Sequence, residues 1–155
     1  MKVRKMKPSD YEKVYALWLN TPNMGLNTVD DSKSGIKKFL KRNPHTCFVA
    51  KKGDEIAGVI LSGHDGRRGF IYHAAVAESE QRKGVGTALV TAAISALQAE
   101  GIIKVGLLAF TDNEAGITFW EKHGFTSRDD VVFRSKPING KKKIEIIKGE
   151  MPNEA

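Results

Sequence analysis

The sequence predicts one α/β domain, and three observations support this expectation. The chain has 155 residues, enough for a single core that buries roughly two thirds of the unfolded chain's surface. Apolar runs of strand length alternate with stretches whose apolar residues recur at helical spacing. A glycine-rich stretch, residues 81–86, joins an apolar strand to an amphipathic helix. We therefore expect a domain over residues 1–137 and a basic tail over residues 138–155.

The domain is predicted to begin with a short strand over residues 3–6 and a helix. Ser9 and Glu12 have the spacing of a capping box, in which each side chain bonds the backbone N–H of the other residue. The helix ends near Asn20, because Thr21-Pro22 follows it. Its inward face is expected to carry Val14, Leu17 and Trp18.

A loop and a second helix are expected next. Residues 23–31 show no clear period and are predicted to form a loop. The second helix covers residues 32–43, and Pro44 ends it. Its inward residues are predicted to be Ile36, Phe39 and Leu40.

Three strands follow, and the third is predicted to be the centre of the sheet. Residues 46–52 and 56–62 flank Gly53-Asp54 as an antiparallel hairpin. The turn Asp65-Gly66 then leads into a strand over residues 70–77. Strict alternation would place Phe70, Tyr72, Ala74 and Val76 on one face, and Ile71, His73 and Ala75 on the other.

The remaining elements alternate between helix and strand. A helix over residues 87–100 ends at Gly101, and residues 102–109 form a nearly unbroken apolar strand. A helix over residues 113–123 is followed by two closing strands, residues 125–128 and 131–136. The tail is expected to add a short strand over residues 144–147.

Composition and charge narrow the functional classes. The net charge is +7, yet the basic residues are spread along the chain, and no aromatic-interleaved basic surface suggests nucleic-acid binding. The lone Cys47 lies in an apolar run and is expected to be a core residue. No apolar run approaches the roughly 20 residues that span a bilayer, and no signal peptide is predicted. We expect a cytoplasmic protein without a membrane or nucleic-acid partner.

The glycine-rich stretch is predicted to cradle an anion. Gly84 and Gly86 remove two side chains where the chain turns from strand to helix, which leaves N–H groups at the positive end of the helix dipole. Arg82 and Lys83 add positive charge beside those donors. The Walker and dinucleotide patterns are not matched, since Leu89 replaces the third dinucleotide glycine.

Two motifs resemble those of the GCN5-related N-acetyltransferase (GNAT) family. Gln81, Gly84 and Gly86 match the acetyl-coenzyme A signature [QR]-x-x-G-x-[GA]. The stretch from Asn113 to Phe125 is similar to the family helix N-x-x-A-x-x-x-Y-x-x-x-G-F. The resemblance implies a mixed, mostly antiparallel central sheet with helices on both faces.

The resemblance further implies acetyl-CoA as co-substrate, held without a metal in a gap between residues 72–76 of the central strand and the strand over residues 102–109. Small residues at the edge of the first strand would leave its backbone free to bond the thioester and pantetheine. The cofactor-binding residues expected on this basis are Ala74, Ala75, Val76, Gln81, Arg82, Lys83, Gly84, Val85, Gly86, Thr87, Asn113 and Phe119.

The catalytic groups depart from the family pattern. Phe70 occupies the position of the family's glutamate base, so Tyr72, His73 or a chain of waters is expected to take the amine's proton. Trp120 occupies the position of the family's tyrosine acid, and an indole N–H does not release its proton. Trp120 is therefore expected either to contact the thioester or to pack in the core.

The acceptor is expected to be an amine on a small molecule or a peptide. Polyamines, amino acids, antibiotics and, as in ribosomal-protein acetyltransferases, protein N-termini stay open. Candidate acceptor contacts are Met24, Leu26, Asp30 and Asp31, on the expected loop between the first two helices. The alternative is a GNAT-fold protein that binds acyl-CoA but has lost catalysis. A homodimer is also compatible with the sequence.

Overall fold

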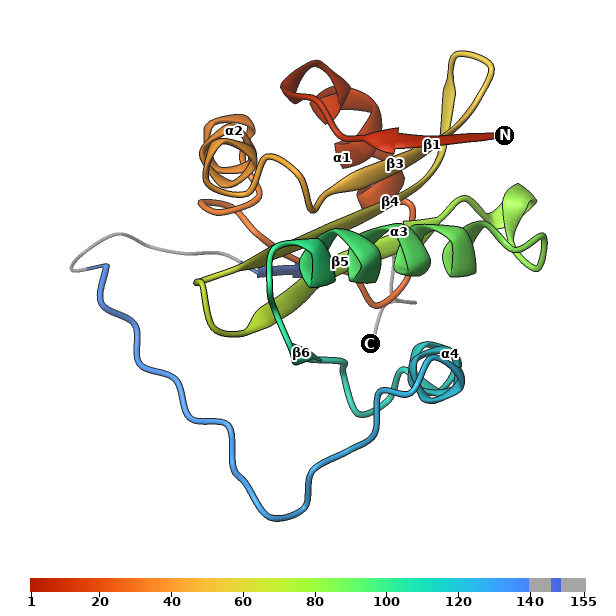
Figure 1. The fold of residues 1–155 in the computed structure, drawn as a ribbon. Helices are drawn as coiled ribbons and strands as arrows, with labels where there is room; N and C mark the ends of the chain where they lie inside the picture. Colours follow the sequence, from red (N-terminus) through yellow and green to blue (C-terminus); the bar gives the residue numbers. More distant parts are fainter. Residues whose placement is uncertain (140–145, 149–155) are drawn as a thin grey trace, which may run out of the picture.

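A five-stranded sheet forms the centre of the computed structural model, which describes residues 1–139 and 146–148. The strand order is β1-β3-β4-β5-β6, and only the last pair is parallel (Figure 1). The hairpin predicted around Gly53 is confirmed by antiparallel pairing of β3 with β4. The strands are β1 (Lys2–Lys5), β3 (Phe48–Lys52), β4 (Glu55–His64), β5 (Gly69–Val76) and β6 (Val105–Leu107).

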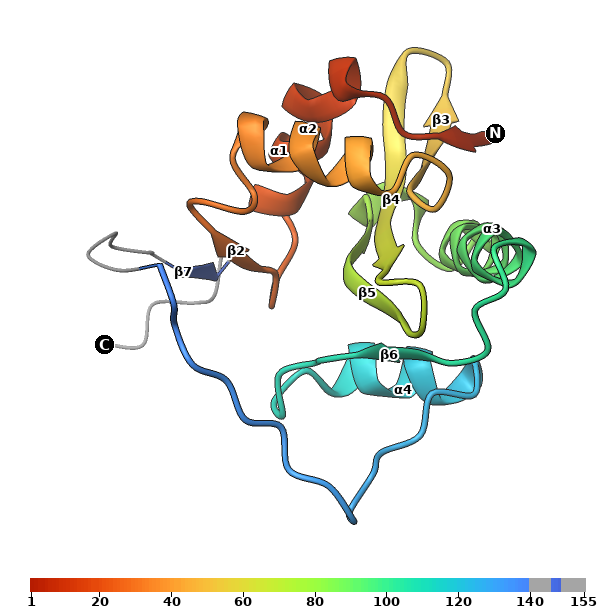
Figure 2. The ribbon, with the colours of Figure 1, turned by 60° about the vertical axis from the view of Figure 1, so that its left-hand side comes forward.

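Helices cover both faces of this sheet, as predicted (Figure 2). One core cluster lies between the sheet and helices α1 (Tyr11–Leu19) and α2 (Lys33–Arg42), and Trp18 at its centre is fully buried. The other cluster lies under α3 (Val85–Ala99), and α4 (Glu114–Lys122) packs against its edge. Cys47 is buried beside Ser62, and burial raises the pKa of its thiol to about 12, so it is a core residue, as expected.

The start of α1 differs from the predicted capping box. The Asp10 carboxylate, instead of Ser9 and Glu12, accepts the Lys7 backbone N–H at 2.8 Å and closes a short 3-10 helix, Pro8–Asp10, ahead of α1. Arg4 donates two further bonds of 2.8 Å to the Asp10 carboxylate. Asp10 therefore stabilises this helix start better than Ser9 would, because a charged bidentate pair is stronger than the bond of a hydroxyl cap. Glu12 points elsewhere and pairs with Lys33.

The predicted loop over residues 23–31 contains a strand. β2 (Gly25–Asn27) pairs antiparallel with β7 (Ile146–Lys148) of the tail. The expected tail strand over residues 144–147 is thus observed over Ile146–Lys148, while residues 144 and 145 lie outside the described residues. Pairing between residues so distant in sequence leaves no local period, so the sequence did not reveal β2.

The end of the domain is less regular than predicted. Residues 125–128 and 131–136 form no strands, and Val131, Val132 and Phe133 are exposed. Their β-propensity is not sufficient without a paired edge and a buried face. The apolar strand expected over residues 102–109 is confined to Val105–Leu107, since β5 pairs with β6 only at residues 69–71.

A β-bulge explains why β5 leaves β6. His73 pairs with Leu61 and Ile71 pairs with Ser62, so Tyr72 is an extra residue on β5. A bulge bends its strand and redirects side chains. The strict alternation predicted for residues 70–77 is therefore wrong, because Tyr72 and His73 lie on the same face, against Phe39 of α2 and Trp18 of α1.

Candidate active site

The predicted anion cradle, residues 81–86, lies where β5 gives way to α3. Gly84 is the N-cap of α3 with φ of 83°, a backbone conformation that glycine adopts without strain. The first bond inside the helix runs from the Ala88 N–H to the Gly84 carbonyl, 3.0 Å away. The N–H groups of Val85, Gly86 and Thr87 come before that bond and have no acceptor within the helix. They lie at the positive end of a four-turn helix.

Side chains around the cradle fix the turn that presents it. Glu80 is buried and accepts from Lys52 at 2.9 Å and from Lys83 at 3.5 Å; the bond from Lys52, more than any other contact, holds the pKa of Glu80 below its usual value. Gln81 Nε2 donates to the Val76 carbonyl at 3.2 Å. Arg82 is exposed and has no ion-pair partner within the described part of the chain.

Gly86 is needed for packing between helices. A Cβ at Gly86 would lie 3.0 Å from Phe119 Cε2, so this glycine makes room for the Phe119 ring of α4. This packing is a reason for the missing side chain that the sequence pattern does not reveal. A second contact joins the same helices: His123 Nδ1 donates to the Phe119 carbonyl at 2.9 Å, and Nε2 then accepts from the Thr87 hydroxyl at 3.2 Å.

The edge of β5 beyond the bulge has no strand partner among the described residues. Residues 73–76 pair with β4 on one side, and β6 stops at the partner of Ile71. The Ala77 N–H donates to the Ala57 carbonyl of the β4 side, so the alternate residues Ala74 and Val76 direct their backbone groups to the open edge. The Ala75 side chain is buried against the α1 cluster and that of Ala74 packs toward α3.

His73 is held by a buried carboxylate. Its Nε2 lies 2.8 Å from Asp31 Oδ1, and the two side chains are only 11% and 7% exposed. An ionised carboxylate only accepts, so Nε2 carries a proton, and in the neutral imidazole Nδ1 has the lone pair. Nδ1 has no hydrogen-bond partner in the described part of the chain, yet it is not sealed from solvent. A backbone bond from Asn27 to Asp31 Oδ2, 2.7 Å long, fixes the carboxylate.

Tyr72 is better suited to donate a proton than to accept one. Partial burial, and to a smaller extent the negative charges of Asp30 and Asp65, raise the pKa of its phenol above the usual value. The phenol therefore keeps its proton at neutral pH. Its ring packs edge-on against Phe39 at 5.4 Å and beside Phe70 at 4.9 Å.

Comparison with known proteins identifies the family. Residues 11–125 match the family model described as "Acetyltransferase (GNAT) family". This chain belongs to that family. A curated relative, Acetyltransferase SG1711 of Sodalis glossinidius (strain morsitans), is 30% identical over 138 residues, which are 89% of this chain and 96% of the relative.

Solved structures agree with this GNAT assignment. The crystal structure of Ard1 from Thermoplasma volcanium has a TM-score of 0.69 at 26% identity and covers 81% of this chain and 82% of its own. The PaiA N-acetyltransferase from Thermoplasma acidophilum, solved in complex with coenzyme A, has a TM-score of 0.72 and covers 83% of this chain and 91% of its own. At 16% identity that second likeness shows the fold alone.

Two residues of the GNAT helix motif have structural partners in α4. Asn113, expected to contact the cofactor, is the N-cap of α4, and its Oδ1 accepts the Gly116 N–H at 3.0 Å. Trp120 packs edge-on against Phe119 at 5.0 Å and Phe125 at 5.2 Å, in the partly buried rim of the α3 cluster. This is the packing environment that was one of the two expectations for Trp120.

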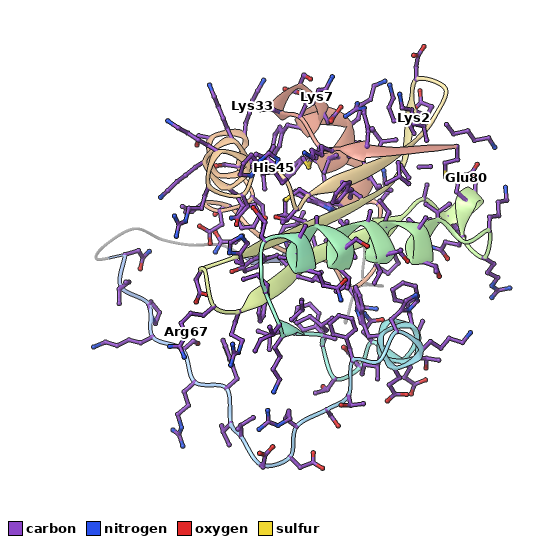
Figure 3. All side chains as sticks on the ribbon, viewed as in Figure 1. Lys2, Lys7, Lys33, His45, Arg67 and Glu80 are labelled. Atoms are coloured by element: carbon purple, nitrogen blue, oxygen red, sulfur yellow. The ribbon has the colours of Figure 1, made fainter. Side chains whose placement is uncertain are left out.

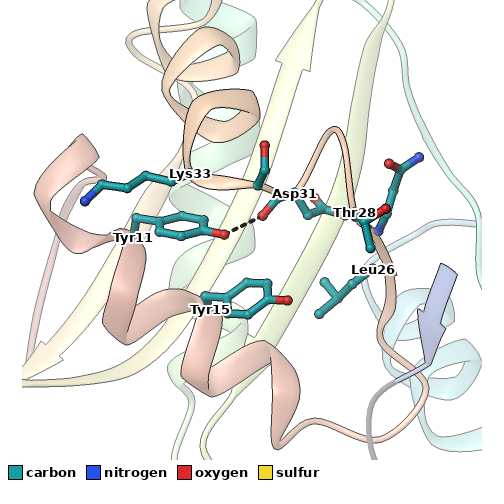
Figure 4. A pocket seen from close by; sticks show the side chains of 8 residues that line it. Tyr11, Tyr15, Leu26, Thr28, Asp31 and Lys33 are labelled. Atoms are coloured by element: carbon teal, nitrogen blue, oxygen red, sulfur yellow. Dashed lines mark hydrogen bonds between the residues drawn. The ribbon is translucent and has the colours of Figure 1, made fainter. Parts of the chain in front are cut away.

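The expected acceptor contacts divide into buried and accessible residues. Met24 and Leu26 are buried, at 6% and 1% exposure, and Asp31 is committed to His73, whereas Asp30 is exposed. Beside them is an open hollow of about 340 Å³ in which Tyr11 stacks on Tyr15 and donates to the Asp31 carbonyl at 2.7 Å (Figure 4).

Two features of this GNAT site escaped prediction from the sequence. The His73–Asp31 pair joins residues 42 apart in sequence, and neither side chain has a local signal that names its partner. A second hollow, lined by Phe39, Arg42, Arg68 and Tyr72, combines α2 with the hairpin between β4 and β5. Within the described residues there is no group of three metal-ligating side chains, and no helix is long and apolar enough to cross a membrane.

Proposed function

We propose that this protein is an acetyl-CoA-dependent N-acetyltransferase that transfers the acetyl group directly to a primary amine. The observation that carries the proposal is the open edge of β5 at residues 72–76, which begins at the His73–Asp31 pair and leads to the anion cradle. Family membership and a fold shared with a coenzyme A-bound N-acetyltransferase support it.

The cradle residues would hold the anionic part of acetyl-CoA, which supplies the acetyl group as a thioester. The free N–H groups at residues 85–87 suit a pyrophosphate, and Arg82 and Lys83 add charge beside them. The backbone N–H groups of Ala74 and Val76 face the open edge, where a donor stabilises a carbonyl oxygen that becomes negative, an effect worth about 3 kcal/mol per donor in other enzymes.

Acetyl transfer requires two proton movements that this chain's residues can perform. The amine nitrogen bonds to the acetyl carbon as the carbon–sulfur bond breaks, so one proton leaves nitrogen and one ends on sulfur. His73 Nδ1 is the candidate acceptor, since Asp31 bonds the opposite ring nitrogen and orients the imidazole. Tyr72, a phenol at neutral pH, is the candidate donor to sulfur, the role that Trp120 cannot perform.

A thiol-release assay tests the proposal. The purified chain is incubated with acetyl-CoA and a panel of primary amines, and free thiol and acetylated amine are both quantified. We expect amine-dependent thiol release with matching product. A melting shift with acetyl-CoA but no release above the amine-free control would favour the alternative, an acyl-CoA-binding protein without catalysis.

A further inference from the structure

The second hollow lies at the opposite end of β5 from the cradle. It has a volume of about 390 Å³ and lies between the C-terminal end of α2 and the β4–β5 hairpin. Figure 3 shows the two ends: Glu80 precedes α3 on one side of the molecule, and Arg67 lies on the other side with the hairpin. We call this space the hairpin hollow; the residues that matter below are Phe39, Arg42, Arg68, Phe70 and Tyr72.

The hairpin hollow adjoins the position proposed for the chemistry. Tyr72 lines it and stands two residues from Ala74, a distance of about 7 Å along a strand. The bulge at Tyr72 turns His73 to the same side of the sheet. The hairpin hollow is therefore within reach of an amine presented near His73.

The hollow offers two guanidinium groups without ion-pair partners in the described part of the chain. Arg42 belongs to the last turn of α2, and Arg68 follows the hairpin turn, where it gives one N–H to the Arg67 carbonyl at 3.0 Å. Guanidinium groups bind carboxylates and phosphates in a bidentate fashion. Three aromatic rings, Phe39, Phe70 and Tyr72, lie beside them.

The other charged groups at this hollow are already engaged. His64 lies 2.9 Å from Glu100. Asp65 Oδ1 accepts the backbone N–H groups of Arg68 and Arg67, which keep the pKa of Asp65 low and bind the carboxylate within its own turn. Asp30 is exposed and does not line the hollow, although its negative charge contributes to the raised pKa of Tyr72. Arg42 and Arg68 thus outweigh the single carboxylate of Asp65, and the net charge of these lining groups is positive.

We infer that the hairpin hollow recognises the acceptor through an anionic group, so that the acceptor is an amine that also carries a carboxylate or a phosphate. This inference rests on the proposed function and names its substrate class. A polyamine or another polycation would place like charge against Arg42 and Arg68, which disfavours it.

Matched pairs of acceptors test the inference. Phenylalanine is compared with phenylalaninamide, and phosphoethanolamine with ethanolamine, so that the two arms separate a carboxylate from a phosphate; spermidine is the polycation. Acetylated product is measured over a range of acceptor concentrations. We expect the anionic member of at least one pair to have a kcat/KM about tenfold higher or more, the scale of one charge-assisted hydrogen bond.

Variants locate the effect. Arg42→Gln and Arg68→Gln should each lower kcat/KM for the anionic member about tenfold, chiefly through KM, and leave the neutral member unchanged. Arg67→Gln is the matched control, because Arg67 lies on the same hairpin but does not line the hollow. It should change neither.

The two proposals fail in different ways. Equal or better turnover of the neutral amines or of spermidine, or no effect of either variant, overturns the inference about the hollow while acetyl transfer to an amine stands. No turnover of any anionic amine also overturns it. Absence of both turnover and a melting shift with acetyl-CoA would count against the proposed function itself.

Discussion

At the scale of single residues, His73 has the environment of a base and Tyr72 that of an acid. We expect His73→Gln to lower kcat about a hundredfold, the lower end of what a general base contributes. Asp31→Asn keeps the imidazole but removes the carboxylate that accepts its Nε2–H, and should lower kcat, because the ring and its tautomer are no longer fixed.

His45→Gln is the control for these variants, since His45 is exposed and contacts Lys5 instead of the site. The measurements are kcat and KM across pH, with acetyl-CoA binding followed separately. If His73→Gln kept its rate while Tyr72→Phe lost it, the proton would leave by way of the phenol or water, and the assignment of the base to His73 would be wrong.

For Trp120, in contrast to His73, we expect little effect on kcat, because its contacts are those of a packing residue. Trp120→Phe should hold kcat within a few-fold and lower the stability by about 1 kcal/mol, since a half-buried aromatic residue becomes smaller. The measurements are steady-state rates and urea denaturation. A loss of kcat of tenfold or more with unchanged melting would show that the indole N–H contacts the reacting thioester.

At the scale of elements, the contact between α3 and α4 depends on Gly86. Gly86→Ala should weaken this contact, because the new Cβ would lie 3.0 Å from Phe119. Phe119→Leu introduced with it should restore part of the stability, so the two changes should be non-additive by about 1 kcal/mol. If the double variant recovers stability but not acetyl-CoA affinity, the missing side chain of Gly86 is also needed for binding the cofactor.

Gly84→Ala is the companion variant for the cradle. The new Cβ would meet no atom within 4 Å. Any change in stability or acetyl-CoA affinity would therefore reflect the strained φ of 83° and the lost access to the backbone.

The sequence predicted the elements that depend on interactions between residues close in sequence, and missed those that depend on distant partners. β3, β4, α2 and α3 were predicted close to their observed positions, because their apolar periods are local. The cradle was predicted from adjacent residues. The bulge at Tyr72 and the pairing of β2 with β7 depend on partner strands distant in sequence, and no local pattern encodes them. The His73–Asp31 pair was not predicted for the same reason, because its two residues are 42 apart in sequence.

At the scale of the whole molecule, packing is uneven along the chain. The two core clusters draw most of their residues from positions 3–107, whereas α4 is attached through the partly buried rings of Phe119, Trp120 and Phe125. Beyond Phe125, residues 126–138 are exposed. Because local opening follows the number of buried contacts, α4 should open at a lower free energy than the sheet.

Acetyl-CoA should reduce the difference in opening free energy between α4 and the sheet, because the cradle adjoins the residues that contact α4. Gly86 and Thr87, at the start of α3, contact Phe119 and His123 of α4. A ligand at 100 times its dissociation constant stabilises the state that binds it by about 2.7 kcal/mol.

In a hydrogen-exchange experiment we therefore expect acetyl-CoA to slow exchange in the first turn of α3 and throughout α4, with little change in α2. Gly84→Ala should weaken this protection in both segments together. Slowing that is confined to α3, or that spreads equally to α2, would show that the cradle and α4 are not coupled through Gly86 and Thr87.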